Sequence, residues 1–193
     1  MSSDDSLGRG ARHRDLESLG PRGEGWVGIQ SALGLLILVV APLTARAWPE
    51  GLSGLVGSIG VAIVFAGIGL FVLGGITLGR SFSIWIKPRP GVPLLKHGIY
   101  RWMRHPVCTA QVLIGLGWAL AWGSLVALAL VPLYAWYLDR YKLEIEERWL
   151  AVTYPEYPAY RSVVRHRMIP WPPGGQPRAA PGGGAADTQV HKG

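Results

Sequence analysis

Three long stretches without a charged residue dominate the chain, and short polar segments separate them. They span residues 26–45, 51–79 and 106–138 and consist mainly of Leu, Ile, Val, Ala and Gly. An α-helix rises 1.5 Å per residue, so about 20 apolar residues cross the roughly 30 Å hydrocarbon core of a bilayer. The first two stretches therefore predict one transmembrane helix each.

The third stretch is too long for one simple span, because about 33 helical residues measure roughly 50 Å. It is also short for two full spans. Gly123 and Ser124 lie near its middle and are typical of a tight turn. Basic residues flank both of its ends, and the positive-inside rule places both ends in the cytoplasm. We therefore expect a helical hairpin with its tip at residues 122–124.

The same rule orients the rest of the chain. Four arginines precede the first span, six basic residues lie in the segment 80–105, and only Arg46 lies between the first two spans. The sequence thus predicts an all-α, polytopic integral membrane protein with four transmembrane helices, the last two forming the hairpin. Both termini are expected in the cytoplasm. A membrane domain over residues 26–173 is expected between disordered tails at 1–25 and 174–193, where apolar periodicity is absent.

Several local features add detail to this predicted topology. Glycines in the second span, among them Gly67, Gly75 and Gly79, favour close helix contacts in lipid, although glycine is common throughout this chain. Prolines break the segment 80–105, so we expect a long loop there. After the hairpin, residues 139–150 predict an amphipathic helix with the i,i+4 pairs Arg140/Glu144 and Glu144/Arg148.

Composition narrows the function. The formal net charge is +7, yet only 16% of residues are charged, and the basic residues lie between apolar spans rather than on a soluble module. Membrane loops explain this pattern better than a nucleic-acid partner does. Cys108 is the single cysteine, so we expect no disulfide within the chain and no cysteine-based zinc site. No metal is expected as a cofactor.

Two polar clusters flank the predicted hairpin. The first covers residues 98–106 and the second joins Glu146 and Glu147 to Tyr157, Tyr160 and Arg161. Each has an ordinary explanation: an interfacial histidine before a helix-starting proline, a solvated glutamate face, and a belt of interfacial tyrosines. If the hairpin forms, however, the clusters meet at the membrane surface and form a pocket open to both water and lipid.

The order of these residues resembles a known family. The pattern G-x-Y-R-x-x-R-H-P over residues 98–106, an apolar stretch, and then E-E-x-x-L with spaced tyrosines is similar to the isoprenylcysteine carboxyl methyltransferase family, part of a wider group of membrane and phospholipid methyltransferases. The resemblance covers residues 78–170. It implies transfer of a methyl group from S-adenosyl-L-methionine to a lipophilic or prenylated carboxylate, amine or thiol drawn from the bilayer, with membrane lipids as the surroundings.

Matched position by position, the resemblance implies a set of functional residues. Arg104 and Glu147 are the candidate catalytic residues. The cofactor-binding candidates are Gly98, Tyr100, Arg104, His105, Pro106, Glu146, Glu147, Tyr157 and Tyr160. Arg104 suits a carboxylate because its guanidinium binds such groups bidentately. The carboxylate of either glutamate can accept hydrogen bonds from the ribose hydroxyls or the amino group of the cofactor. His105 suits cofactor orientation better than proton abstraction.

The chain departs from the family pattern at Cys108, where a tyrosine is usual, which puts any contact from that ring in doubt. Two other functions stay open. Membrane sterol reductases, which use NADPH, have a similar C-terminal half, but Val107 and Cys108 replace their Asn and Tyr after R-H-P. A non-catalytic membrane scaffold with the same fold is the second, although the polar residues needed for catalysis are all present. The methyl acceptor is not identified by the sequence.

Overall fold

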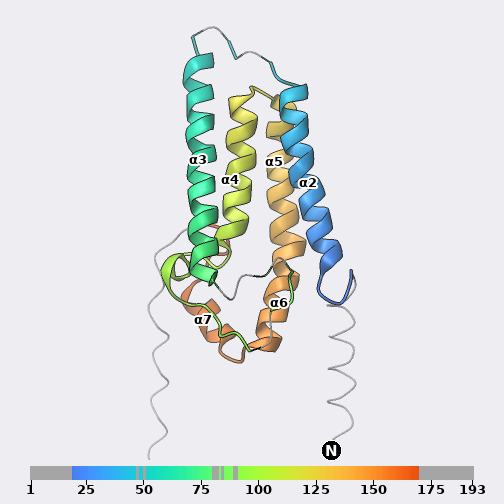
Figure 1. Ribbon diagram of the computed structural model, residues 1–193, viewed down its shortest axis with the longest axis vertical. Coiled ribbons are helices and arrows are strands. Elements are labelled where there is room, and N and C mark those ends of the chain that lie inside the picture. The colour runs from blue at the N-terminus through green and yellow to red at the C-terminus, as the bar shows by residue number, and fades with distance from the viewer. Residues whose placement is uncertain are drawn as a thin grey trace, which may run out of the picture.

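The computed structural model describes residues 19–46, 48–49, 51–79, 83, 85–88 and 91–169, and these contain helices and no strand (Figure 1). The predicted tails fall mostly on residues outside this part of the chain, as do Arg80 and Arg89 of the basic loop. In chain order the elements are α2 (Glu24–Leu43), α3 (Ser53–Leu78), the 3-10 helix η2 (Gly98–Arg101), α4 (Pro106–Ala121), α5 (Leu125–Tyr137), the π-helix η3 (Leu138–Lys142), α6 (Leu143–Thr153) and α7 (Tyr157–Val163).

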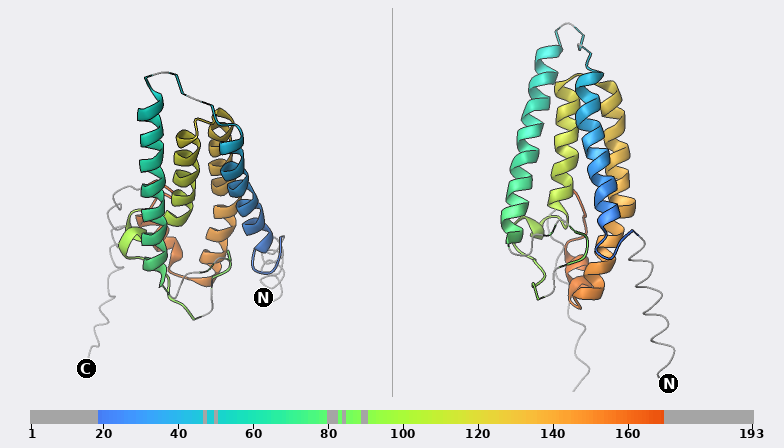
Figure 2. Two further views of the ribbon diagram at one scale, coloured as in Figure 1. Left: turned by 45° about the horizontal axis from the view of Figure 1, so that its top comes forward. Right: turned by 45° about the vertical axis from the view of Figure 1, so that its right-hand side comes forward.

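Four long helices, α2 to α5, lie side by side, and α6 and α7 lie together at one end of them (Figures 1 and 2). The α2–α3 and α4–α5 connections are both at the opposite end. Two of the helices, α2 and α3, are long and apolar enough to cross a membrane. Large apolar side chains on them, such as Leu35, Phe65 and Ile76, are exposed. Exposed apolar surface of this extent is typical of a face that meets lipid or another protein.

Glycines on one face of α3 bring this helix against α4. A Cβ atom added at Gly67 would lie 2.8 Å from Ile114 Cγ1, and one added at Gly60 would lie 2.5 Å from the backbone nitrogen of Ala121. Gly75 and Gly79, by contrast, have nothing within 4 Å of such an atom. Close helix contact was therefore the right prediction for Gly67, while Gly75 and Gly79 face open space. Backbones can approach this closely only where the side chains are small.

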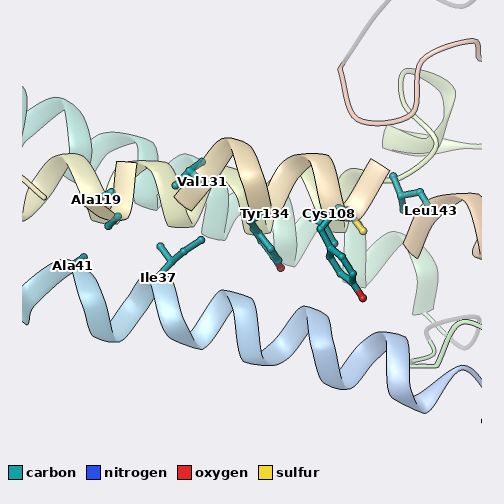
Figure 3. Packing of buried hydrophobic residues seen from close by; sticks show 10 residues of the cluster. Ile37, Ala41, Cys108, Ala119, Val131, Tyr134 and Leu143 are labelled. Carbon is teal, nitrogen blue, oxygen red and sulfur yellow. The ribbon is translucent and has the colours of Figure 1, made fainter. Parts of the chain in front are cut away.

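The main apolar core lies between α2, α4 and α5 (Figure 3). Ile37 and Ala41 of α2, Ala119 of α4 and Val131 of α5 are buried there. Cys108, Tyr134 and Leu143 extend the core towards α6. This packing fixes the end of α4 that carries the polar residues 104 and 105, so the core positions the site described below.

The three residues between α4 and α5 form a tight connection. Gly123 has a φ of 65° and lies directly against the carbonyl oxygen of Arg46, so a side chain at this position is excluded both by conformation and by space. Ser124 caps α5, because its hydroxyl accepts a hydrogen bond from the backbone nitrogen of Ala127. The same hydroxyl lies 2.6 Å from the Thr44 hydroxyl at the end of α2.

The polar helix after the last apolar stretch continues directly from α5. A π-helical turn, η3, joins α5 to α6, and α6 ends at Thr153, before the segment that leads into α7. Of the two expected ion pairs of Glu144, the one with Arg148 is present at 3.4 Å. The pairing with Arg140 was wrong, since Glu144 instead contacts Arg167 at 2.6 Å. The π turn changes the register that the i,i+4 argument assumed.

We predict that Gly67→Val destabilises the protein by about 1–3 kcal/mol, because its added methyl groups must push α3 away from Ile114. Gly69→Val is the matched control, since a Cβ there meets nothing within 4 Å. Unfolding by SDS titration of the protein in detergent micelles measures both variants. Equal stability of the two would contradict the packing described for this face.

Candidate active site

The two polar clusters meet around one cavity of about 260 Å³, at the end of the helices where α6 and α7 lie. Residues of the cluster before α4 and of the cluster on α6 and α7 face it together, although more than 40 residues separate Arg104 from Glu146 along the chain. The lining includes Tyr100, Arg104, His105, Glu146, Tyr157 and Tyr160. On another side it is lined by apolar and weakly polar residues of α2, α3 and α4, namely Val27, Gln30, Ser31, Phe71, Leu78, Val107, Cys108 and Gln111.

The carboxylate of Glu147 pairs with four cationic or protonatable side chains, of which Arg161, with its Nε atom 3.8 Å from Oε2, is the most exposed. The Oε1 atom of Glu147 accepts a hydrogen bond from Arg104 Nε at 2.9 Å and lies 3.2 Å from His105 Nε2. Arg167 donates to both oxygens, each at 3.2 Å. Glu147 is 3% exposed and Arg104 is 6% exposed. A buried carboxylate needs such complete pairing, because an uncompensated charge in this environment is costly.

Arg104 also binds the segment that follows α7. Its Nη1 atom donates to the carbonyl oxygens of Val164 and Arg165, at 2.6 and 2.9 Å. The backbone nitrogens of Arg104 and His105 donate to the carbonyls of His166 and Arg167. With Nε and Nη2 directed at Glu147, nearly all the N–H groups of Arg104 are used inside the protein. The guanidinium therefore has no free fork for a ligand carboxylate.

Glu146 faces the cavity and forms a second ionic cluster with His105 and Lys142. One oxygen accepts a hydrogen bond from Lys142, and the other lies 3.5 Å from His105 Nδ1. Lys142 also donates to the sulfur of Cys108 at 3.4 Å. Unlike Glu147, the Glu146 side chain keeps part of its surface accessible, so it can accept hydrogen bonds from a ligand.

Charge pairing sets the ionisation of both glutamates and of His105. Burial raises the pKa of Glu147, but its hydrogen bond and charge interaction with His105, together with Arg104 and Arg167, lower that pKa to about 2. Burial likewise opposes ionisation of Glu146, yet Lys142 and His105 hold its pKa well below the usual range. Burial disfavours a charged His105, but both glutamates outweigh it and raise the pKa of the imidazole. The two carboxylates beside the ring therefore favour its protonated form.

Four tyrosines line the cavity, namely Tyr100, Tyr154, Tyr157 and Tyr160. The hydroxyl of Tyr160 donates to the carbonyl of Tyr100 at 2.7 Å, which ties α7 to η2. Tyr157 is almost fully buried, and its hydroxyl has no hydrogen-bond partner within the described part of the chain. Burial raises the pKa of Tyr157, so the phenol is neutral at physiological pH. A buried hydroxyl without a partner at a cavity wall is suited to a ligand group.

Three of the predicted site residues do not line the cavity. Glu147 lies behind the wall, where it is occupied by Arg104, His105 and Arg167. Pro106 is buried as the first residue of α4. Gly98 has a φ of 61°, and a Cβ there would lie 2.8 Å from Thr77 Cγ2, so this glycine permits η2 to approach the end of α3.

The sequence patterns missed several residues of the site. Arg167 bridges Glu144, Glu147 and the carbonyl of Asp139. Lys142 neutralises Glu146, and the i,i+4 spacing of these two residues was the available signal. The amides of Gln30 and Gln111 are joined by a 2.8 Å hydrogen bond within the apolar helices. A polar side chain inside an apolar span is itself a signal for a site, since burying it in lipid is costly.

Comparison with known proteins agrees with the resemblance noted from the motifs. Residues 59–152 match the model of the isoprenylcysteine carboxyl methyltransferase (ICMT) family. The matched segment contains both Arg104-His105-Pro106 and Glu146-Glu147, and it ends before the tyrosines of α7. A search of curated proteins found no match to the chain.

We predict that Glu147→Gln lowers stability by about 3 kcal/mol at neutral pH, because Arg104 and Arg167 lose their shared carboxylate. The folded-state pKa of about 2 lies below the usual value of 4.5, so the unfolded chain takes up the proton first as the pH falls. The difference in unfolding free energy between wild type and Glu147→Gln is therefore complete above about pH 5 and is lost towards pH 2. SDS unfolding at a series of pH values checks this.

Glu156→Gln serves as the control for this variant, since Glu156 is exposed and lies 3.9 Å from Lys96. We expect it to change stability by less than about 1 kcal/mol. Parallel pH curves for wild type and Glu147→Gln would contradict the role assigned to Glu147.

Proposed function

Because the chain belongs to the isoprenylcysteine carboxyl methyltransferase family, whose members are membrane methyltransferases, we propose that it transfers a methyl group from S-adenosyl-L-methionine to a lipophilic acceptor. The acceptor is a carboxylate, amine or thiol on a molecule that reaches the site from the bilayer. The reaction takes place in the cavity shared by η2, α4, α6 and α7.

The observation that carries this proposal is the composition of the cavity wall. On one side are the ionic and phenolic groups of Glu146, His105 and Tyr157, and on the other are apolar residues of α2 and α3, such as Val27 and Phe71. A soluble, cationic cofactor and an apolar acceptor have to meet for this reaction. A cavity with one polar and one apolar side brings the two together and excludes water.

The residues present fit S-adenosylmethionine. The ionised Glu146 is suited to ribose hydroxyls or to the amino group, and the unpartnered hydroxyl of Tyr157 supplies a further hydrogen bond. Leu94, Leu150 and Tyr154 provide an apolar surface for a purine ring. The faces of Tyr100 and Tyr160 suit a sulfonium cation. When bound, the cofactor supplies a methyl group on a good leaving group, so that no protein nucleophile is required.

The geometry favours orientation over proton abstraction for His105. Its two ring nitrogens face Glu147 and Glu146, at 3.2 and 3.5 Å, and its pKa is raised. A ring whose two nitrogens both face carboxylates is poorly placed to accept a substrate proton, but it fixes the position of Glu146. We assign Glu147 the role of a positioning residue, since it acts through Arg104 and His105. Arg104 retains about one N–H for an acceptor oxygen.

We further propose that α2, α3, α4 and α5 all cross the membrane, with the α4–α5 pair as a hairpin. The α2–α3 and α4–α5 connections lie at the same end of the molecule, and the cavity lies at the other. Most basic residues belong to the segments that precede, join or follow the helices at the cavity end. The positive-inside rule therefore assigns this end, and both termini with it, to the cytoplasm. An acceptor then enters sideways between α2 and α3, where Phe71 and Val27 line the cavity.

We predict that the purified full chain in detergent micelles binds S-adenosylhomocysteine, as measured by calorimetry. Glu146→Gln and Tyr157→Phe each weaken this binding by about tenfold, because each removes a polar contact worth about 1.5 kcal/mol. Glu156→Gln, on the exposed surface, leaves the affinity unchanged. Binding of NADPH instead of S-adenosylhomocysteine by the wild type would refute the methyltransferase proposal and favour a reductase.

We predict that a reporter of membrane sidedness inserted after Gly123 reports the side opposite to one fused at the C-terminus. A third reporter between α2 and α3 should agree with the one after Gly123. The same side for the Gly123 and C-terminal reporters would refute the hairpin, while binding of the cofactor analogue would be unaffected by that result.

A further inference from the structure

An uncharged polar pair lies inside the apolar part of the cavity, away from the ionic cluster. Gln30 of α2 donates from Nε2 to Gln111 Oε1 of α4 at 2.8 Å, and Tyr134 of α5 donates to the same oxygen at 3.5 Å. Gln30 is only 9% exposed. Both glutamines line the cavity, whereas Tyr134 does not. Three helices thus place two amides where the surrounding residues are apolar.

The hydrogen bonds of this pair are incomplete. Gln30 Oε1 is buried and has no partner among the residues that the structure describes. Gln111 is bonded only through its carbonyl oxygen, to Gln30 and Tyr134, and its Nε2 atom forms no hydrogen bond within the same set of residues. A buried acceptor without a partner is costly, and a glutamine amide turns easily about its last torsion. The pair therefore retains one acceptor and one donor for another molecule.

The pair connects with the reaction end of the cavity. Gln111 lies three residues after Cys108 on α4, about 4.5 Å along the helix, on the same face. Cys108 contacts Lys142, and Lys142 binds Glu146. The polar wall thus extends from Glu146 to Gln30, roughly one to two helical turns deeper than the ionic groups. A molecule long enough to enter from lipid and reach Glu146 passes the two amides.

We propose that Gln30 and Gln111 form a subsite that recognises an uncharged hydroxyl or amide group on the lipophilic acceptor. This inference rests on the proposed function, because it concerns the second substrate of that site. A hydroxyl or an amide both donates and accepts, as the free atoms of the pair require. The enzyme therefore favours acceptors with such a group in their apolar body over plain hydrocarbon chains.

Charged groups suit this position less well. A carboxylate would face the unpartnered oxygen of Gln30. An ammonium would have no carboxylate beside it, because Glu146 already binds Lys142 and lies near His105. A hydrocarbon would leave both amide atoms without a partner. A neutral hydroxyl or amide satisfies the donor and the acceptor together, which a carboxylate, an ammonium or a hydrocarbon does not.

The test compares two isoprenoid probes that differ in one hydrogen-bond donor. Dissociation constants of tritiated farnesol and of its methyl ether are measured for the full chain in lipid nanodiscs, with binding to empty nanodiscs subtracted. We expect wild type to bind farnesol about five- to tenfold more tightly than the ether. Gln30→Leu removes this preference, so that the ratio of the two constants falls to about one.

Two variants separate recognition from packing. Val27→Ala changes the cavity wall one turn away on α2 without altering a polar group, and Tyr134→Phe disturbs the amide pair from outside the cavity. Both should retain the wild-type ratio even where stability or overall affinity falls. A wild-type ratio near one, or equal weakening of both probes by Gln30→Leu, would overturn the proposal and leave the glutamines as a link between helices.

The failure of this inference and the failure of the proposed function are distinguishable, because the probes bind without methyl transfer. If the protein prefers farnesol but does not bind S-adenosylhomocysteine, the subsite proposal stands and the proposed reaction is refuted. If the protein binds the cofactor analogue but shows no preference between the two probes, the proposed reaction stands and the subsite proposal is refuted.

Discussion

One buried carboxylate holds the polar end of the molecule together. Glu147 of α6 binds Arg104 and His105, which precede and cap α4, and Arg167, which follows α7. Three segments distant in the sequence thus share one charge. Arg104 extends the link to the carbonyls of Val164 and Arg165, so that the segment after α7 closes against the start of α4. The cavity exists because these segments meet, although Glu147 does not itself line it.

The neighbouring Glu146 has a different role because of its place on the same helix. Successive residues on an α-helix point about 100° apart, so two adjacent glutamates cannot face the same surroundings. Glu147 points into the ionic network, and Glu146 faces the cavity with Lys142 and His105 beside it. One glutamate thus positions the wall and the other offers its oxygens to a ligand. His105 lies between them and keeps their geometry fixed.

The apolar helices contribute more than an anchor. Close contact between α3 and α4 at Gly60 and Gly67, and the core between α2, α4 and α5, position the apolar side of the cavity among the long helices. Within that apolar side, Gln30 and Gln111 are polar groups with unfilled hydrogen-bonding capacity. In a hydrocarbon environment such groups are retained only where they hold helices together or bind a molecule. The proposed selection of the acceptor is assigned to this part of the cavity wall.

The sequence by itself determined the class of the protein and the parts of its site. Uncharged stretches of helix length and the arrangement of R-H-P, E-E and spaced tyrosines depend on local composition and order, which a single chain displays directly. Tertiary structure alone decided which of these residues face the cavity. The exclusion of Gly98, Pro106 and Glu147 from its wall, and the inclusion of Arg167 in its ionic network, depend on how α6 and the segment after α7 dock against α4. That docking is a sum of contacts between distant segments, and no local pattern encodes it.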